Sequence, residues 1–250
     1  MWIIPAIDLK DGRCVRLTQG RMQDEIVYSD DPVSVARRWA AAGAEWLHVV
    51  DLDAAVAGHT RNRDCIRRIV AAAGIPVQVG GGLRTAADVD ACLSIGVRRA
   101  IIGTAATGDL ALLRDLCRRH PGRIAVGIDA RNGRVATHGW TRTTDIAAVD
   151  LARRVEEAGV EAIIFTDIHR DGMQTGPNID ETRRLAEAVR LPVIASGGVG
   201  SLEHIEALLP LEAAGVVGVI TGKALYSGAV EFAAARALAA RRLDKPHYEN

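Results

Sequence analysis

The sequence of 250 residues has few aromatic side chains and no excess of charge of either sign. Phe, Trp and Tyr together make up 4% of the chain, and 31 basic residues balance 31 acidic ones. Proteins that bind nucleic acid or anionic membrane surfaces are typically basic, so this balance indicates neither partner. No apolar run reaches the roughly 18 residues that a membrane-spanning helix needs. We therefore expect neither nucleic acid nor a membrane as a partner.

Cysteine is also scarce. The four cysteines, Cys14, Cys65, Cys92 and Cys117, all lie in the first half of the chain. None belongs to a Cys-x-x-Cys pair or to a Cys/His cluster with the spacing of a zinc site. The N-terminus carries no basic segment followed by a cleavage site, as a secretory signal would. These absences predict reduced cysteines, no metal site and a cytoplasmic protein.

What the chain does contain is a repeated pattern. Residues 5–13 and residues 126–134 each form a short apolar run that ends in an aspartate, Asp8 or Asp129, and leads into a turn. Residues 75–82 and 191–198 form a second pair at a constant offset (75 + 116 = 191 and 82 + 116 = 198). A period of about half the chain is too long for a solenoid. It predicts two similar halves, approximately residues 1–120 and 121–241, that share one core.

Short apolar runs alternate with amphipathic segments along the whole chain. Helix starts are predicted at Asp31, at Thr85 and at Thr144-Asp145, the last before a helix over residues 146–158. No linker-like stretch divides the chain, and its length is typical of one α/β barrel. Strands are predicted at residues 2–8, 45–51, 75–79, 97–102, 123–129, 160–166, 191–196 and 215–221.

Eight strands separated by helices predict a parallel sheet with right-handed crossovers. The predicted fold is therefore α/β, a single (β/α)8 TIM barrel over residues 1–250 with an internal two-fold half-barrel repeat. The alternative is an open doubly wound sheet. It accounts less well for the repeat, because only a closed barrel makes halves of four units equivalent.

Glycine-rich loops follow the corresponding strands of both halves. In such barrels the loops at the carboxyl ends of the strands form the active site, and they often bind a phosphate. Glycine lets the backbone approach an anion closely, and the first N–H groups of the next helix donate to it. A single loop of this kind could equally be a tight turn, but its duplication favours binding. The candidates are Gly81, Gly82, Gly103 and Thr104 in the first half, and Gly197, Gly198, Gly222 and Lys223 in the second.

The two predicted phosphate sites lie on opposite sides of the barrel, which is roughly 15 Å across. A small molecule that reaches both must be long and carry a phosphate at each end. Asp8 and Asp129 lie between them, opposite one another. Paired carboxylates suit general acid and base catalysis, although an acid near neutral pH needs a pKa raised by roughly 3 units, about 4 kcal/mol. A divalent metal is the less favoured alternative, because no third ligand accompanies the pair.

Four other polar or aromatic residues are candidates from their positions alone. Thr166 ends the sixth strand and could orient a reacting oxygen, and Asp171 could act as an acid or simply form a turn. Trp140 follows a glycine in a loop and could stack on a planar ring. His48 has the strand parity of Val50 and is predicted to point inward, either toward a ligand or as a core histidine.

These motifs together resemble a known family, the phosphoribosylformimino-aminoimidazole carboxamide ribotide isomerases of histidine biosynthesis. The resemblance runs nearly end to end. It implies a cofactor-free Amadori rearrangement, in which an aminoaldose with a phosphoribosyl group at each end becomes an aminoketose. Such an enzyme is an intramolecular oxidoreductase. The matching segments are residues 5–9, 48–53, 78–84, 139–140, 166–172 and 195–198.

The resemblance also implies roles for individual residues. Asp8 matches the base that removes the C2 proton of the opened sugar, and Asp129 matches the acid of ring opening, with Thr166 assisting. Asp171 matches a second candidate for the acid, so that assignment stays divided. Trp140 would stack on the aminoimidazole carboxamide. The expected substrate-binding residues are the eight of the two loops, Trp140, Arg16, His48, Arg84, Gly176 and Ser196.

One segment departs from the family pattern. Residues 172–176 read Gly-Met-Gln-Thr-Gly, where the family often has Gly-Thr-Leu-x-Gly, so the loop after the sixth strand is less well matched. Three alternatives remain: the sister cyclase of the pathway, a dual-substrate isomerase that also acts on phosphoribosyl anthranilate, and a non-catalytic phosphosugar-binding barrel. We expect a monomer with a bisphosphorylated small-molecule substrate.

Overall fold

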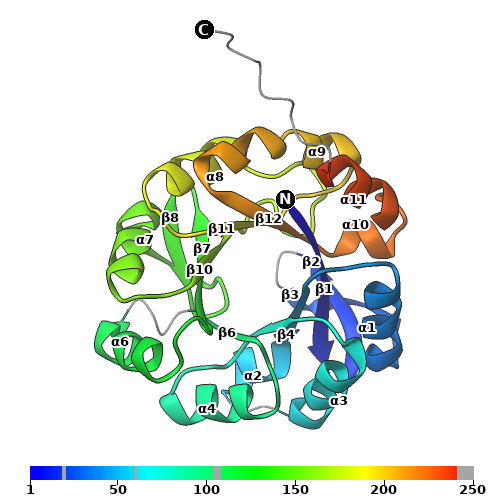
Figure 1. The fold of residues 1–250 in the computed structure, drawn as a ribbon, viewed down its shortest axis with the longest axis horizontal. Coiled ribbons are helices and arrows are strands. Elements are labelled where there is room, and N and C mark those ends of the chain that lie inside the picture. Colours follow the sequence, from blue (N-terminus) through cyan, green and yellow to red (C-terminus); the bar gives the residue numbers. More distant parts are fainter. Residues whose placement is uncertain (19–20, 59–60, 104–107, 241–250) are drawn as a thin grey trace, which may run out of the picture.

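Eight parallel strands close into a barrel surrounded by helices (Figure 1). The computed structural model describes residues 1–18, 21–58, 61–103 and 108–240. The first strand pairs with the last, and β7 pairs with β10, so the ring has no open edge among these strands. The predicted TIM barrel is confirmed, and the open sheet is wrong. The barrel strands are β1 (Trp2–Lys10), β4 (Leu47–Asp51), β5 (Val77–Gly80), β6 (Arg99–Ile102), β7 (Ile124–Arg131), β10 (Ala162–Asp167), β11 (Val193–Ser196) and β12 (Val216–Thr221).

Alternate residues of each strand face opposite sides of the barrel wall. In β1, Ile3 and Ile7 pack in the large core between the wall and the helices, whereas Ile4 and Ala6 belong to a smaller apolar cluster. That smaller cluster also takes residues from β6, β7, β10, β11 and β12, and it packs inside the barrel. Asp8 has the parity of Ile4 and Ala6, so it points inward above this cluster.

The outer helices begin and end largely where capping residues predict. The Asp31 side chain accepts from the N–H groups of Val33 and Ser34, and Thr85 forms a reciprocal capping box with Asp88. Such caps typically contribute about 1 kcal/mol each. The helices are α1 (Pro32–Ala41), α2 (Leu52–Ala57), α3 (Arg63–Ala73), α4 (Ala86–Ser94), α6 (Leu110–Arg119), α7 (Ala148–Glu157), α8 (Ile179–Glu187), α9 (Leu202–Glu206), α10 (Lys223–Tyr226) and α11 (Phe232–Ala240), with a 3-10 helix at Leu209–Ala214. Within the described parts of the chain, no helix has both the length and the apolar character to cross a membrane.

One predicted helix start is wrong. Thr144 and Asp145 belong to a strand, β9 (Arg142–Ala147), and α7 begins only at Ala148, without a side-chain cap. Apolar periodicity over residues 146–158 marked the helix correctly. The polar residues before it pair instead with β8 (Arg134–Thr137), a tertiary arrangement that overrides their capping propensity.

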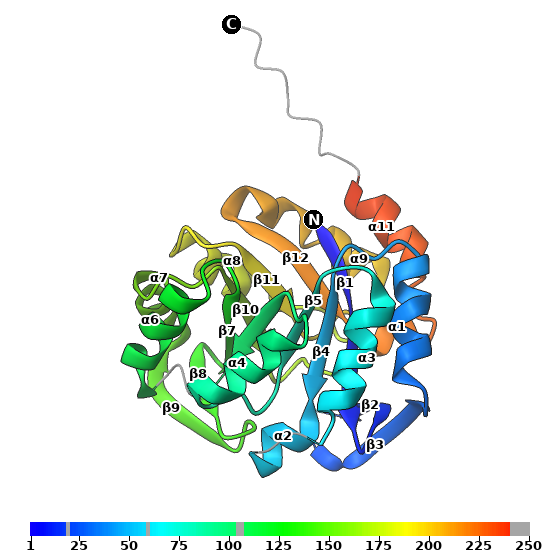
Figure 2. The same cartoon turned by 60° about the horizontal axis from the view of Figure 1, so that its bottom comes forward.

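Two β-hairpins extend the barrel strands, one in each half. After β1 the chain turns into β2 (Arg13–Thr18) and β3 (Arg21–Ser29), and after β7 it turns into β8 and β9. Both first turns are two-residue turns with positive φ at each position: Asp11 (49°) and Gly12 (75°), then Asn132 (51°) and Gly133 (72°). These are the type I′ turns that Asp-Gly and Asn-Gly favour. The sequence analysis predicts only a turn at each position, although the Asp-Gly and Asn-Gly pairs also indicate hairpins. Figure 2 shows both hairpins and α2 at one end of the barrel, away from the N-terminus.

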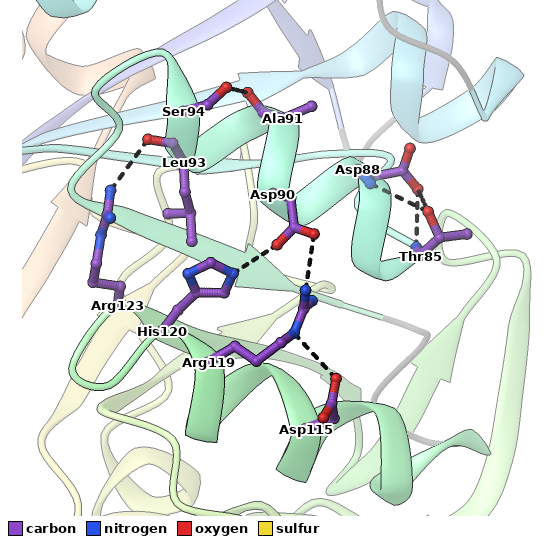
Figure 3. A network of polar contacts seen from close by, with 10 residues as sticks. All are labelled: Thr85, Asp88, Asp90, Ala91, Leu93, Ser94, Asp115, Arg119, His120 and Arg123. Carbon is purple, nitrogen blue, oxygen red and sulfur yellow. Dashed lines mark hydrogen bonds and ion pairs between the residues drawn. The ribbon is translucent and has the colours of Figure 1, made fainter.

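A polar network on the outer surface ties α4 to α6 (Figure 3). Asp90 accepts from Arg119 at 2.9 Å and contacts the His120 ring nitrogen Nε2 at 2.7 Å, and Arg119 also contacts Asp115 at 3.1 Å. Exposed pairs of this kind contribute little to stability, because water and salt screen the charges. The network supports the packing of neighbouring helices and takes no part in the barrel mouth.

Candidate active site

A cavity of about 1110 Å³ occupies the carboxyl ends of the barrel strands. All eight strands contribute to its wall, and the two hairpins, α2 and the glycine loops form its rim. Most of the predicted site residues line it: Asp8, Arg16, His48, Gly81, Gly82, Arg84, Gly103, Asp129, Trp140, Thr166, Asp171, Ser196, Gly197, Gly198, Gly222 and Lys223. Thr104 lies outside the described residues.

Asp8 is held by an arginine from the first hairpin. The Arg16 Nη1 atom donates to Asp8 Oδ2 at 2.6 Å, and the two side chains are only 11% and 13% exposed. Strand β2 runs back antiparallel along β1, which brings Arg16 over the end of the first strand. Burial raises the pKa of Asp8, and the charge of Asp171 adds to this rise, whereas Arg16 opposes it. The net shift is upward, toward a carboxylate that can exchange a proton.

Asp129 is held by neutral donors from the second hairpin and from β10. The indole Nε1 of Trp140 donates to Asp129 Oδ2 at 2.8 Å, and the Thr166 hydroxyl also bonds to this carboxylate. Trp140 lies in the turn between β8 and β9 with φ of 71°. Burial raises the pKa of Asp129, both hydrogen bonds lower it, and Asp171 raises it further. The two-fold-related aspartates therefore have different partners, one cationic and one neutral.

Asp171 is a third buried carboxyl group in the same cavity. It lies in the turn after β10, and burial raises its pKa while Arg16 and Lys223 lower it. The Lys223 Nζ atom donates to the carbonyl oxygen of Gly172, the next residue, at 3.0 Å. The cavity thus holds three carboxyl groups with raised pKa values beside two cations. This arrangement can both remove and supply protons.

The glycine loops require glycine for steric reasons as well. A Cβ at Gly81 would lie 2.2 Å from the carbonyl oxygen of Asp51, and one at Gly198 would lie 2.3 Å from that of Gly176. Gly103 differs, because a Cβ there would have no neighbour within 4 Å among the residues that the structure describes. The tight-turn interpretation and the binding interpretation are therefore compatible at these positions. Gly176 itself does not line the cavity, and its N–H supports Gly198 from behind at 2.8 Å.

An Asp–Asn pair with a buried aspartate supports the loop system in each half, and neither pair was predicted. Asn62 Nδ2 donates to Asp51 at 2.7 Å, and Asn178 Nδ2 donates to Asp167 at 2.6 Å. Both members repeat at the offset seen before (51 + 116 = 167 and 62 + 116 = 178). The carbonyl groups of Asp51 and Asp167 lie against Gly81 and Gly197. Extending the repeat search to single polar residues could have found these pairs.

The remaining cavity residues are held by nearby backbone or side-chain groups. Arg84 Nη2 donates to the carbonyl oxygen of Ala55 at 2.7 Å, at the rim. Arg131, which we had not predicted, also lines the cavity, and it donates to the Trp140 carbonyl oxygen at 3.3 Å. Within the described ranges, no group of three or more His, Cys, Asp or Glu side chains is placed to hold a metal ion.

Comparison with known proteins agrees with this geometry. A family model described as "Histidine biosynthesis protein" matches residues 2–231. The chain belongs to this family. Among curated family members, a protein of Geotalea daltonii is 56% identical over 241 residues, which is 96% of this chain and 98% of that protein. A protein of Geobacter sulfurreducens is also 56% identical over 241 residues, covering 96% and 99%. One of Trichlorobacter lovleyi is 57% identical over 230 residues, covering 92% and 94%.

All three of these histidine biosynthesis proteins carry the same name, 1-(5-phosphoribosyl)-5-((5-phosphoribosylamino)methylideneamino) imidazole-4-carboxamide isomerase. The similarity covers almost the whole barrel and both halves of the repeat. The family resemblance drawn from the motifs is therefore confirmed, and the sister cyclase and the non-catalytic barrel are not favoured.

Proposed function

We propose that this chain catalyses the Amadori rearrangement of N′-(5′-phosphoribosylformimino)-5-aminoimidazole-4-carboxamide ribotide, converting the aminoaldose to its phosphoribulosyl form. The observation that carries the proposal is the cavity itself. Glycine loops from both halves form its rim, and buried carboxyl groups lie in its wall. The names of relatives at 55–57% identity point to the same reaction.

The layout of the cavity supports a substrate with two phosphorylated ends. Loops after β5 and β6 would hold one phosphate, and loops after β11 and β12 would hold the other, with Lys223 adding a positive charge. In the strand order of the closed barrel, β5 and β6 lie on the opposite side of the ring from β11 and β12. The reacting sugar would then lie between the ends, within reach of the carboxyl groups.

In this proposal the carboxyl groups divide the proton transfers. Asp129 protonates the ring oxygen and opens the ribose, and Asp8 then removes the C2 proton to give an enaminol. Asp8 then returns the proton to C1 while the C2 hydroxyl group gives its proton back to Asp129, which yields the aminoketose and restores both carboxyl groups. The net reaction is an isomerisation and needs no external oxidant or cofactor. Positioned groups of this kind typically contribute about 10²–10⁴-fold each to the rate. Thr166 would keep Asp129 oriented through its hydroxyl.

Asp171 is the alternative candidate for the general acid that opens the ribose ring. We favour Asp129 because two neutral donors, Trp140 and Thr166, orient it, whereas Asp171 faces the cations Arg16 and Lys223, which favour its ionised form. In our proposal Asp171 instead helps to keep Arg16 in place. The Trp140 ring, anchored by its N–H group, would stack on the aminoimidazole carboxamide.

Replacement of Asp8 by Asn tests the proposal. Asp8→Asn should lower kcat by 10²–10⁴-fold or more, because the amide cannot accept the C2 proton. Binding of a bisphosphorylated product analogue should stay within a few fold of wild type. Asp11→Asn is the matched control, since Asp11 lies three residues further on, in the turn that follows β1, and does not line the cavity. Near-normal turnover by Asp8→Asn would refute the mechanism.

The substrate range and the setting of the enzyme are part of the same proposal. We expect a monomer that works in the cytoplasm on a bisphosphorylated small molecule. An assay with phosphoribosyl anthranilate distinguishes the single-substrate isomerase from the dual-substrate one. We expect no turnover of that compound.

A further inference from the structure

A row of polar side chains crosses the inner wall of the barrel beneath the cavity. His48 on β4 is directly beside Gln78 on β5, which is directly beside Arg99 on β6. Gln78 is fully buried and Arg99 is 3% exposed. His48 alone reaches the cavity, where it lines the floor next to Ala6, one inward position below Asp8. The proposed catalytic groups do not include any of these three.

The hydrogen bonds of this row have only one consistent arrangement. Arg99 donates from Nε and Nη2 to one Gln78 atom, at 3.2 and 2.7 Å. An arginine has donors only, so that atom must be the amide oxygen of Gln78. The amide nitrogen then faces His48 Nδ1 at 3.0 Å. It carries two donors and no acceptor, so Nδ1 must accept, and the single proton of a neutral imidazole must be on Nε2.

We infer that Arg99 and Gln78 are positioning residues that hold His48 as its Nε2–H tautomer, making it a permanent neutral hydrogen-bond donor to an oxygen of the substrate on the cavity floor. The identity of that oxygen, a sugar oxygen between the two phosphates, rests on the proposed function. The assignment of the tautomer does not depend on the proposed function.

The burial of Arg99 supports a role beyond stability. A buried guanidinium is costly unless it is well paired, and burial lowers the pKa of Arg99, with Glu161 opposing that effect. The Arg99 Cζ atom lies 4.4 Å from the centroid of the Trp46 ring. Two N–H groups of Arg99 donate to the neutral amide of Gln78. An apolar residue at this position would fill the barrel at lower cost. The arginine instead provides what a neutral residue does not, a strong donor that orients Gln78.

The surroundings of His48 keep its ring neutral. Burial, followed by the positive charges of Arg16 and Arg99, lowers the pKa of His48 to about 3. Within the described residues the ring makes no second hydrogen bond, so its Nε2–H group is available to a ligand. An imidazole in this state cannot exchange protons near neutral pH, which leaves acid and base chemistry to the carboxyl groups.

Nitrogen-15 NMR of the wild-type protein without ligand tests the tautomer directly. Long-range correlations from the ring carbon protons distinguish protonated from unprotonated nitrogens, and a His48→Gln sample assigns the signals among the seven histidines. We expect His48 Nδ1 to be unprotonated and Nε2 to be protonated from pH 6 to pH 8. A proton on Nδ1, or a titration of the ring within this range, would overturn the inference.

Two variants test the positioning role. In Gln78→Glu the carboxylate can only accept, so it should draw a proton onto His48 Nδ1, and the ring should begin to titrate near neutral pH. Arg99→Met keeps an unbranched side chain against Trp46 but frees the Gln78 amide to turn, so both tautomers should appear. Its kcat/KM should fall roughly ten-fold, the loss of about one hydrogen bond.

Arg98→Met is the matched control, because Arg98 precedes Arg99 in the chain but its side chain is 47% exposed. It should leave both the His48 signals and kcat/KM as in wild type. An unchanged His48 tautomer in Gln78→Glu, or wild-type kcat/KM in Arg99→Met, would refute the inference. If wild-type protein fails to turn over the proposed substrate while the tautomer is as expected, the proposed function fails and the tautomer assignment stands.

Discussion

Two glycines in the first phosphate loop system should respond very differently to the same added methyl group. Gly81 has φ of 98°, and a Cβ there would lie 2.2 Å from the Asp51 carbonyl oxygen, which belongs to the barrel wall. Gly103 lies one strand further on, where a Cβ would meet no described residue within 4 Å. Both line the same cavity, so they form a matched pair.

The cost of Gly81→Ala has two parts. The left-handed backbone conformation costs an alanine roughly 1–2 kcal/mol, and forcing a methyl group against a strand costs roughly 1–3 kcal/mol more. The two parts sum to roughly 2–5 kcal/mol, with a middle of about 3.5 kcal/mol. For a domain of this size, that corresponds to a fall in Tm of roughly 7–14 °C. Gly103→Ala should change the unfolding free energy by no more than about 0.5 kcal/mol.

Thermal and urea denaturation measure the loss of stability in Gly81→Ala, and steady-state kinetics measure the effect of Gly103→Ala on KM. Gly103→Ala should melt with the wild type and raise KM, because its methyl group projects into the space proposed for a phosphate. Gly81→Ala should lose stability whether or not ligand is present. If Gly81→Ala melts within about 2 °C of wild type, the steric reasoning for this loop is wrong.

Three further outcomes follow from the contacts of the carboxyl groups. Arg16 lowers the pKa of Asp8, so Arg16→Met should raise that pKa and move the acid limb of the kcat/KM profile to higher pH, because the base must be ionised to act. Trp140→Phe keeps an aromatic ring but removes the hydrogen-bond donor to Asp129, so the pKa of Asp129 should rise and the basic limb of the same profile should move to higher pH. A basic limb that does not move would favour Asp171 as the acid. Asn178→Ala leaves a buried carboxylate oxygen without its donor and should reduce the unfolding free energy by roughly 1–3 kcal/mol in urea titrations, with wild-type stability refuting the support that we assign to this pair.

Much of the barrel could be predicted because local signals agreed with the global fold. All eight barrel strands were predicted from short apolar runs, and the caps at Asp31 and Thr85 were predicted from residue type. The strands β2, β3, β8 and β9 were missed. Their sequences mix apolar residues with charged and hydroxyl side chains and lack the nearly continuous apolar runs of the barrel strands, so a search for such runs did not reveal them. The Asp11-Gly12 and Asn132-Gly133 turns could have indicated them.

The candidate site divides in a similar way. Position on a strand predicted that Asp8, His48, Asp129 and Thr166 would face one cavity, because side-chain parity has a period of two. It could not predict that Gly176 would stand behind the wall, since that depends on how the loop after β10 packs against Gly198.

By itself, the sequence determined the repeat, the barrel and the set of residues at its mouth, because these depend on local patterns and on a constant offset along the chain. Only the tertiary structure decided the partner of each reactive group. Arg16 pairs with Asp8, Trp140 pairs with Asp129, and Gln78 orients His48. These partners come from other strands or from hairpins that fold back. Their hydrogen bonds and burial set the pKa values and tautomers, so two aspartates in similar local sequences acquire different chemistry.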